Sequence, residues 1–181
     1  MRKGNIYKVD ILIRAETPDD YAAIYAVTEA AFVGTEHADG NEQELPDKLR
    51  QKVGFRPELS LVAELDGVIV GHVLFTEMTV GETPAVCVGP VSVLPHLQGK
   101  GIGAALMEAG HEAAHELDFS LCVLCGHEDY YPRFGYEPIG QHGITFPFDA
   151  PEACKMVKFL DERGKSVRGV AIFPPELMEG S

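Results

Sequence analysis

The stretch Gln98-Gly99-Lys100-Gly101-Ile102-Gly103 constrains this chain more than any other part of its sequence. A run of apolar, β-branched residues precedes it at 85–94, and a helical pattern follows it at 104–117. Glycines allow left-handed φ values and let a ligand approach the backbone closely. The free N–H groups and the dipole of a helix N-terminus favour an anion. The stretch therefore predicts either a phosphate-binding loop or a tight strand-to-helix turn that binds nothing.

The spacing of these glycines excludes two common nucleotide-binding loops. Their order is Gly-x-Gly-x-Gly, so the Rossmann pattern G-x-G-x-x-G is not met. No Gly-Lys-Ser/Thr follows, as a P-loop requires. A nucleotide-type ligand would therefore have to bind by another arrangement.

Three segments, in order along the chain, resemble the GNAT superfamily of N-acetyltransferases. The Gln-x-x-Gly-x-Gly pattern at 98–103 resembles its acyl-CoA pyrophosphate loop. Upstream, Val88-Gly89-Pro90-Val91-Ser92-Val93-Leu94-Pro95 resembles its fourth strand, and downstream, Tyr130-Tyr131-Pro132-Arg133-Phe134-Gly135-Tyr136 resembles its YY-x-R-F-G-aromatic segment. Three motifs in the right order are far more specific than one. The resemblance covers nearly the whole chain and implies one N-acetyltransferase domain over 1–181 that uses acetyl-CoA.

The periodicity of apolar residues predicts alternating strands and helices. We expect strands at 7–14, 60–65, 68–75, 85–94, 119–125, 136–139, 156–160 and 167–173, and helices at 18–32, 45–53, 104–117 and 130–134. Asp66-Gly67 predicts an antiparallel hairpin between the second and third strands. The helix at 104–117 connects two strands, which should therefore be parallel neighbours.

These elements predict a mixed α/β fold. We expect six or seven of these strands to form one mostly antiparallel sheet with helices on both faces. The resemblance places acyl-CoA between a splayed parallel pair, the fourth and fifth strands. Gly89-Pro90 lies inside the fourth strand, and because proline cannot donate to a sheet, we expect a bulge or a loss of pairing there. Free backbone groups at Val91, Ser92 and Val93 could then bind an amide-bearing ligand, and the resemblance implies the pantetheine arm of CoA. A distortion that binds no ligand is the alternative.

The resemblance also assigns residues to the pyrophosphate and to catalysis. Its pyrophosphate loop corresponds to Gln98, Gly99, Lys100, Gly101, Ile102, Gly103 and Ala104. Tyr131 lies four residues before Gly135 and corresponds to the family's tyrosine that donates a hydrogen bond to the leaving thiolate. Tyr130 is the alternative donor, and either ring could instead only pack on CoA. The sequence marks no general base; Glu77 is one candidate, and a chain of water molecules is another.

Composition and charge limit the cell compartment and the partners. The 181 residues, 45% of them hydrophobic, suit one globular domain. Neither an apolar run of ~18 residues nor a leader is visible, so we expect a cytoplasmic protein with no membrane span. A net charge of −13 argues against nucleic acid and anionic membranes, which require a basic face. The four cysteines are expected to be reduced core residues, with a redox or metal pair as the alternative: Cys87, Cys122, Cys125 and Cys154.

An acidic segment at 35–47 suggests the kind of acceptor. It carries no lysine or arginine and five acids: Glu36, Asp39, Glu42, Glu44 and Asp47. The resemblance places one wall of the acceptor site there, and unneutralised carboxylates attract a cation. The segment therefore predicts a basic amine with at least two positive centres, although a solvated acidic loop would look the same. The oligomeric state is left open, a homodimer included.

One pattern favours a different function. His111-Glu112-Ala113-Ala114-His115 matches H-E-x-x-H, in which two histidines bind zinc and the glutamate acts as a base. No third ligand is marked, and the apolar face of the helix is already occupied, so we expect two solvent-facing histidines and no metal. The sequence thus predicts an N-acetyltransferase that moves an acetyl group from acetyl-CoA to a primary amine by direct attack in a ternary complex. A non-catalytic acyl-CoA sensor and a zinc protease are the alternatives.

Overall fold

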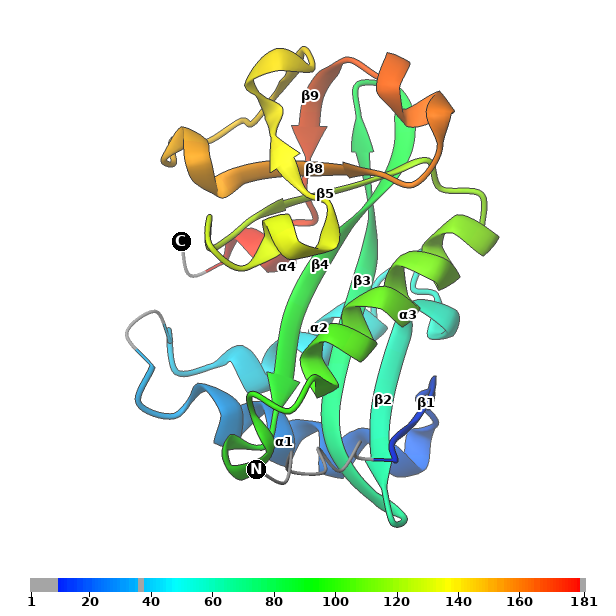
Figure 1. Cartoon of the computed structure of the whole chain (residues 1–181), viewed down its shortest axis with the longest axis vertical. Coiled ribbons are helices and arrows are strands. Elements are labelled where there is room, and N and C mark those ends of the chain that lie inside the picture. Colours follow the sequence, from blue (N-terminus) through cyan, green and yellow to red (C-terminus); the bar gives the residue numbers. More distant parts are fainter. Residues whose placement is uncertain (1–9, 36–37, 180–181) are drawn as a thin grey trace, which may run out of the picture.

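The strands form one mixed sheet, most of whose pairs are antiparallel (Figure 1). The computed structural model describes residues 10–35 and 38–179. Nine strands of these residues join the sheet in the order β1-β2-β3-β4-β5-β8-β6, with β9 paired to β3 and β7 to β9. Only the pairs β4–β5 and β7–β9 of the described strands are parallel. The strands are β1 (Leu12–Ala15), β2 (Ser60–Leu65), β3 (Val68–Val80), β4 (Thr83–Val93), β5 (Leu121–Cys125), β6 (Glu137–Pro138), β7 (Ile144–Thr145), β8 (Lys155–Phe159) and β9 (Gly169–Ile172).

Helices cover both faces of this sheet. They are α1 (Tyr21–Phe32), α2 (Leu45–Arg50), α3 (Ile102–Glu116) and the short α4 (Pro175–Met178). Successive side chains of a strand point to opposite faces. Ala63 packs in the cluster that contains Leu106 of α3, whereas Val62 packs in the cluster that contains Ile24 of α1. The predicted mixed sheet with helices on both faces is therefore confirmed. Its predicted six or seven strands are too few, because β9 and the short β7 extend the sheet beside β3 to nine strands within the described residues.

A bulge in β4 and a break beside it shape the middle of the sheet. Val73 pairs with Val91, but Phe75 pairs with Val88, so β4 carries one extra residue at Gly89-Pro90. This is the bulge that the proline predicts. The parallel pairing of β4 with β5 consists of Val86 with Cys122 and Cys87 with Val123. Beyond these pairs the strands separate, and in Figure 1 β4 runs down the molecule while β5 lies across its upper half.

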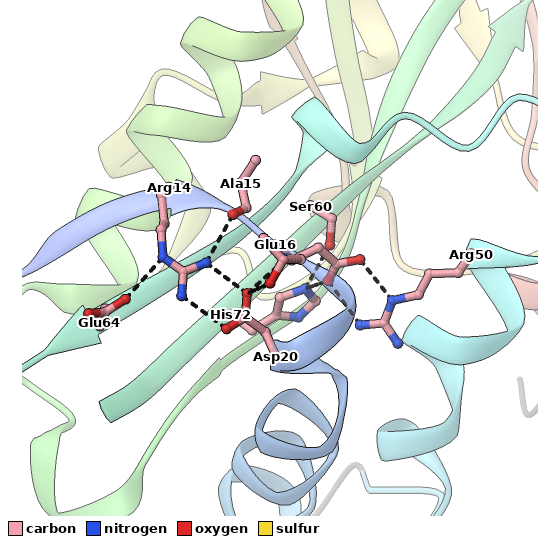
Figure 2. Close-up of polar contacts among 9 residues, drawn as sticks. Arg14, Ala15, Glu16, Asp20, Arg50, Ser60, Glu64 and His72 are labelled. Carbon is pink, nitrogen blue, oxygen red and sulfur yellow. Dashed lines mark hydrogen bonds and ion pairs between the residues drawn. The ribbon is translucent and has the colours of Figure 1, made fainter. Parts of the chain in front are cut away.

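A buried polar network fixes α2 against the sheet (Figure 2). Arg50, the last residue of α2, donates from Nε to Glu16 Oε1 at 2.8 Å and from Nη2 to Oε2 at 2.9 Å. His72 Nε2 lies 3.3 Å from Glu16 Oε2 and 2.9 Å from Ser60 Oγ. Burial opposes the charge on Glu16, but the hydrogen bonds from Arg50 and His72 outweigh it and lower its pKa to about 2. Burial lowers the pKa of His72, so this histidine is neutral.

Several element boundaries differ from the prediction. The second helix ends at Arg50, so its predicted continuation to Val53, a residue that is 99% exposed, is wrong. Only Pro46 and Leu49 of α2 are buried, so this short helix already covers its part of the sheet. The chain then turns away from the sheet at Gly54, whose φ is +91°. The first part of the strand predicted at 7–14 lies outside the described residues.

Candidate functional site

A cavity of about 710 Å³ opens where β4 and β5 separate. The β4 bulge, the glycine loop, the first turn of α3 and the segment after β5 form its walls. It is lined by Phe32, Gly89, Pro90, Val91, Val93, Leu97, Gln98, Gly99, Gly101, Ile102, Gly103, Ala104, His127, Tyr130, Tyr131 and Arg133. The break in the sheet therefore leads directly to the helix N-terminus that follows the glycines.

The glycine loop turns the chain from β4 into α3. Gly99 and Gly101 have φ values of +73° and +86°, which disfavour any other residue. Gln98 Nε2 donates to Val93 O at 3.0 Å and ties the loop to the end of β4. The first N–H groups of a helix have no carbonyl of that helix to bond to. Since Ile102 lines the cavity, this anion-binding end of α3 lies at its wall.

Most of the predicted ligand-binding residues meet at this cavity. Val91, Val93, Tyr131 and all of the predicted loop residues except one are among its lining. Ser92 is not, because alternation along β4 turns its side chain to the α1 face, where it donates to Thr28 Oγ1 at 3.3 Å. Lys100 is exposed and is also absent from the lining.

Two tyrosines occupy different parts of the cavity wall. The ring of Tyr131 packs edge-on against Tyr130 and Tyr136, with centroids 5.1 and 5.7 Å away. Burial raises the pKa of Tyr131 to about 12. The ring lies so close to Gly126 that a Cβ there would be 2.4 Å from Tyr131 Cε2. The hydroxyl of Tyr130 lies 3.3 Å from the position of a Cβ on Gly103, at the start of α3.

The sequence interpretation assigned no role to four side chains of the lining: Phe32, Leu97, His127 and Arg133. Phe32 comes from the end of α1, far away in the sequence, and no pattern linked it to the loop. Arg133 lies within the motif at 130–136, so its position was visible although its role was not.

Glu77, a candidate base, does not belong to the cavity. Its side chain accepts a hydrogen bond from Arg56 Nε at 2.7 Å. It is not among the residues that line the cavity. The structure therefore gives no support to Glu77 as the base.

The two histidines of the H-E-x-x-H pattern have different environments. His111 is buried, and its Nε2 lies 2.8 Å from Tyr136 Oη, so the prediction that it faces solvent is wrong. His115 is exposed, as predicted. The reason for the burial of His111 is the orientation of α3: His111 and Ala114 are among its buried residues, so the buried face of the helix includes the first histidine of the pattern. Across the described residues, no group of three or more His, Cys, Asp or Glu side chains is arranged to hold a metal ion.

The acidic segment is partly neutralised by residues outside it. Asp47 pairs with Arg50, and Glu44 lies 3.9 Å from Lys48 Nζ. The expectation of unneutralised acids is therefore wrong for these two carboxylates. Glu36 lies outside the described residues. A second cavity of about 90 Å³ lies between this segment and α4, lined by Asp39, Asn41, Glu42, Leu45, Lys48, Glu176, Leu177 and Glu179.

The cysteines are free, and two of them are buried. Cys87 and Cys122 lie in the core, as predicted. Cys125, at the end of β5, is exposed and Cys154 is half-buried, so the prediction that all four are core residues is wrong for these two. No helix of the described residues combines the length and apolar character needed to cross a membrane.

Comparison with known proteins identifies the family. The sequence profile of the acetyltransferase (GNAT) family matches residues 21–136, which include the cavity walls. The chain belongs to the GNAT family. This acetyltransferase is 36% identical over 158 residues to YjhQ of Escherichia coli (strain K12), an uncharacterized N-acetyltransferase, across 83% of this chain and 84% of that protein.

Solved structures of GNAT proteins share the fold of this acetyltransferase. A GNAT family acetyltransferase from Brucella melitensis in complex with acetyl-CoA is 31% identical, with a TM-score of 0.74 and coverage of 93% of this chain and 98% of that one. YhbS, a GNAT family N-acetyltransferase from Escherichia coli in complex with CoA, is 27% identical, with a TM-score of 0.83 and coverage of 93% and 92%.

Proposed function

We propose that this chain, as a single N-acetyltransferase domain, transfers the acetyl group of acetyl-CoA to a primary amine by direct attack in a ternary complex. One observation carries the proposal: a break in the sheet, a glycine loop at a helix N-terminus and a buried tyrosine all open onto one cavity of about 710 Å³. The related structures in complex with acetyl-CoA and with CoA support the same ligand.

The cavity walls suit the two ends of acetyl-CoA. Past Cys87, the edge of β4 that faces β5 has no strand partner among the described residues, and backbone groups at Val91 and Val93 can hydrogen-bond pantetheine amides. The N–H groups at Gly101, Ile102 and Gly103 suit the pyrophosphate, which needs donors and a favourable helix dipole. The bulge at Gly89-Pro90 turns the strand where the thioester would lie.

Tyr131 would assist the leaving group. During transfer the amine nitrogen bonds to the acetyl carbon, the C–S bond breaks, and its electron pair goes to sulfur. The proton that the nitrogen loses would pass to a chain of water molecules. Because the pKa of Tyr131 is about 12, its hydroxyl is protonated at neutral pH and can donate to the thiolate. A thiol has a pKa near ~8.5, so Tyr131 stabilises the thiolate by a hydrogen bond rather than by giving up its proton. A backbone N–H of β4 would stabilise the thioester oxygen.

The acceptor we propose is a cationic amine with a second positive group. The reacting amine must lose a proton, since its reference pKa is near ~10.4. Four carboxylates line the second cavity, those of Asp39, Glu42, Glu176 and Glu179, and its single cationic side chain, Lys48, lies 3.6 Å from Glu179 Oε2. They could bind the second positive group while the reacting amine faces the break in the sheet. The Michaelis constant should then rise with salt, because salt screens exposed charges.

The experiment that tests this function is thiol release from acetyl-CoA in the presence of a panel of amines. We expect release with at least one polyamine, aminoglycoside-like amine or basic peptide, and an N-acetylated product by mass spectrometry. Tight acetyl-CoA binding without release for any amine would instead favour a sensor. The Michaelis constant for the best amine could also stay unchanged with salt and in the double variant Asp39→Asn/Glu176→Gln. That result would contradict the cationic acceptor but leave acetyl transfer itself standing.

A further inference from the structure

Arg133 differs from most arginines of this acidic protein. Arg14, Arg50, Arg56 and Arg163 each form an ion pair with a carboxylate. No carboxylate within the described ranges 10–35 and 38–179 pairs with Arg133, although the chain has 28 acidic and 15 basic residues. Of the described arginines, Arg133 and Arg168 have no carboxylate partner, and only Arg133 of these two lines the cavity.

Two contacts hold the Arg133 side chain in place. Its Nε donates to Tyr130 O at 2.9 Å. Its guanidinium carbon lies 4.5 Å from the centroid of the Tyr130 ring. An arginine has five N–H donors in a fixed planar fork, so the four on Nη1 and Nη2 remain available. The geometry pre-organises them, because stacking fixes the plane of the guanidinium.

Arg133 lies at the phosphate end of the cavity. It is the one arginine or lysine among the cavity-lining residues of the described chain. Tyr130, on which it stacks, reaches the start of α3, with its hydroxyl 3.3 Å from the position of a Cβ on Gly103. The positive end of the helix and the free face of the guanidinium therefore lie near the same part of the ligand.

We propose that Arg133 binds the 3′-phosphate of CoA and makes this enzyme discriminate CoA from dephospho-CoA. The glycine loop and the dipole of α3 already supply donors for the pyrophosphate. The 3′-phosphate lies beyond it on the ribose and, as a monoester, carries −1.5 to −2 charges at neutral pH. Arginine binds such a group through two parallel hydrogen bonds. In a chain of net charge −13, this contact also offsets the general repulsion of an anionic ligand.

The test is a set of dissociation constants for CoA and dephospho-CoA, measured by calorimetry. The inference rests on the proposed binding of CoA in this cavity. We expect wild type to bind CoA about tenfold more tightly than dephospho-CoA, a preference that falls as salt rises. Arg133→Gln should bind both ligands equally, with the affinity for dephospho-CoA unchanged. Arg133→Lys should keep part of the preference, because it retains the charge but loses the planar fork.

Arg168→Gln is the matched control. Arg168 is also exposed, donates to the backbone carbonyls of Lys165 and Val167 and lies outside the cavity lining, so its loss changes the net charge equally. The proposal is overturned if wild type binds CoA and dephospho-CoA equally well, or if Arg168→Gln lowers the preference for CoA as much as Arg133→Gln does. It is also overturned if Arg133→Gln weakens the binding of both ligands equally, because that result would assign the arginine to the pyrophosphate. Failure of wild type to bind either ligand would refute the proposed function instead.

Discussion

Gly126→Ala tests whether catalysis depends on the position of Tyr131. Gly126 follows β5 directly and has no positive φ, so alanine fits its backbone conformation. The added Cβ would lie 2.4 Å from Tyr131 Cε2 and 3.0 Å from Cδ2. Non-bonded carbon atoms are separated by about 3.5 Å or more, so the Tyr131 ring must be displaced by about 1 Å.

This displacement should act mainly on the chemical step. A 1 Å misplacement of a group that contacts the reacting atoms can cost about 100-fold in rate. Leu124 Cδ1 would lie 3.3 Å from the same Cβ, so the ring has to move away from both. We expect kcat to fall by about 10- to 100-fold, with little change in acetyl-CoA affinity. Overpacking should also lower the free energy of unfolding by about 1–3 kcal/mol.

The assay is thiol release at saturating acetyl-CoA with the best amine of the panel, alongside calorimetry and urea unfolding. Gly140→Ala is the control, because Gly140 has no positive φ and no atom lies within 4 Å of the Cβ it would gain. A folded Gly126→Ala protein with the kcat of wild type would refute the reasoning that the ring position of Tyr131 limits catalysis.

Three further predictions concern the donor, the loop and the buried network. Tyr131→Phe should lower kcat by ~100-fold, the low end for a general acid, because a thiolate is already a fair leaving group, and should leave acetyl-CoA affinity unchanged. An unchanged kcat would leave Tyr131 only a packing role. Gly103→Val should weaken acetyl-CoA binding more than tenfold by calorimetry, whereas Lys100→Ala should cost about 1 kcal/mol; equal binding by Gly103→Val would contradict a backbone phosphate site. The pKa of Glu16 in the folded protein is about 2, below its usual 4.5, so its ionised form stabilises the folded state by about 3 kcal/mol above pH 4.5. This stabilisation should be lost as the pH falls toward 2. Urea unfolding should show that Glu16→Gln removes most of this acid dependence, and an equal loss in that variant would contradict the assignment.

Local sequence signals predicted the parts of the fold that depend on backbone chemistry. Asp66 and Gly67, both with positive φ, form the hairpin turn, because few other residues tolerate that conformation. Pro90 produced a bulge because it has no N–H to donate. The glycine loop was recognisable because Gly99 and Gly101 adopt positive φ values that other residues disfavour. Such features are encoded by one or two residues and do not depend on distant partners.

Features that depend on tertiary packing could not be predicted in this way. Periodicity allowed several rotations of α3 about its axis, and only contact with Tyr136 and Phe75 determines that His111 is buried. Phe32 reaches the cavity because α1 crosses the sheet beside β4. The partners of Glu44 and Asp47 lie just beyond the acidic segment, and a count of charges within it could not reveal them.

The short pairing between β4 and β5 has a consequence for how the molecule opens. Two residue pairs join these strands directly, so the amide protons along the free edge of β4 should exchange rapidly with solvent in the unliganded enzyme. A bound CoA would replace the missing strand partner at Val91 and Val93 and slow that exchange. At a concentration 100 times its dissociation constant, it would also add about 2.7 kcal/mol to the stability of the folded state. We therefore expect the two halves of the sheet to open more independently without ligand than with it.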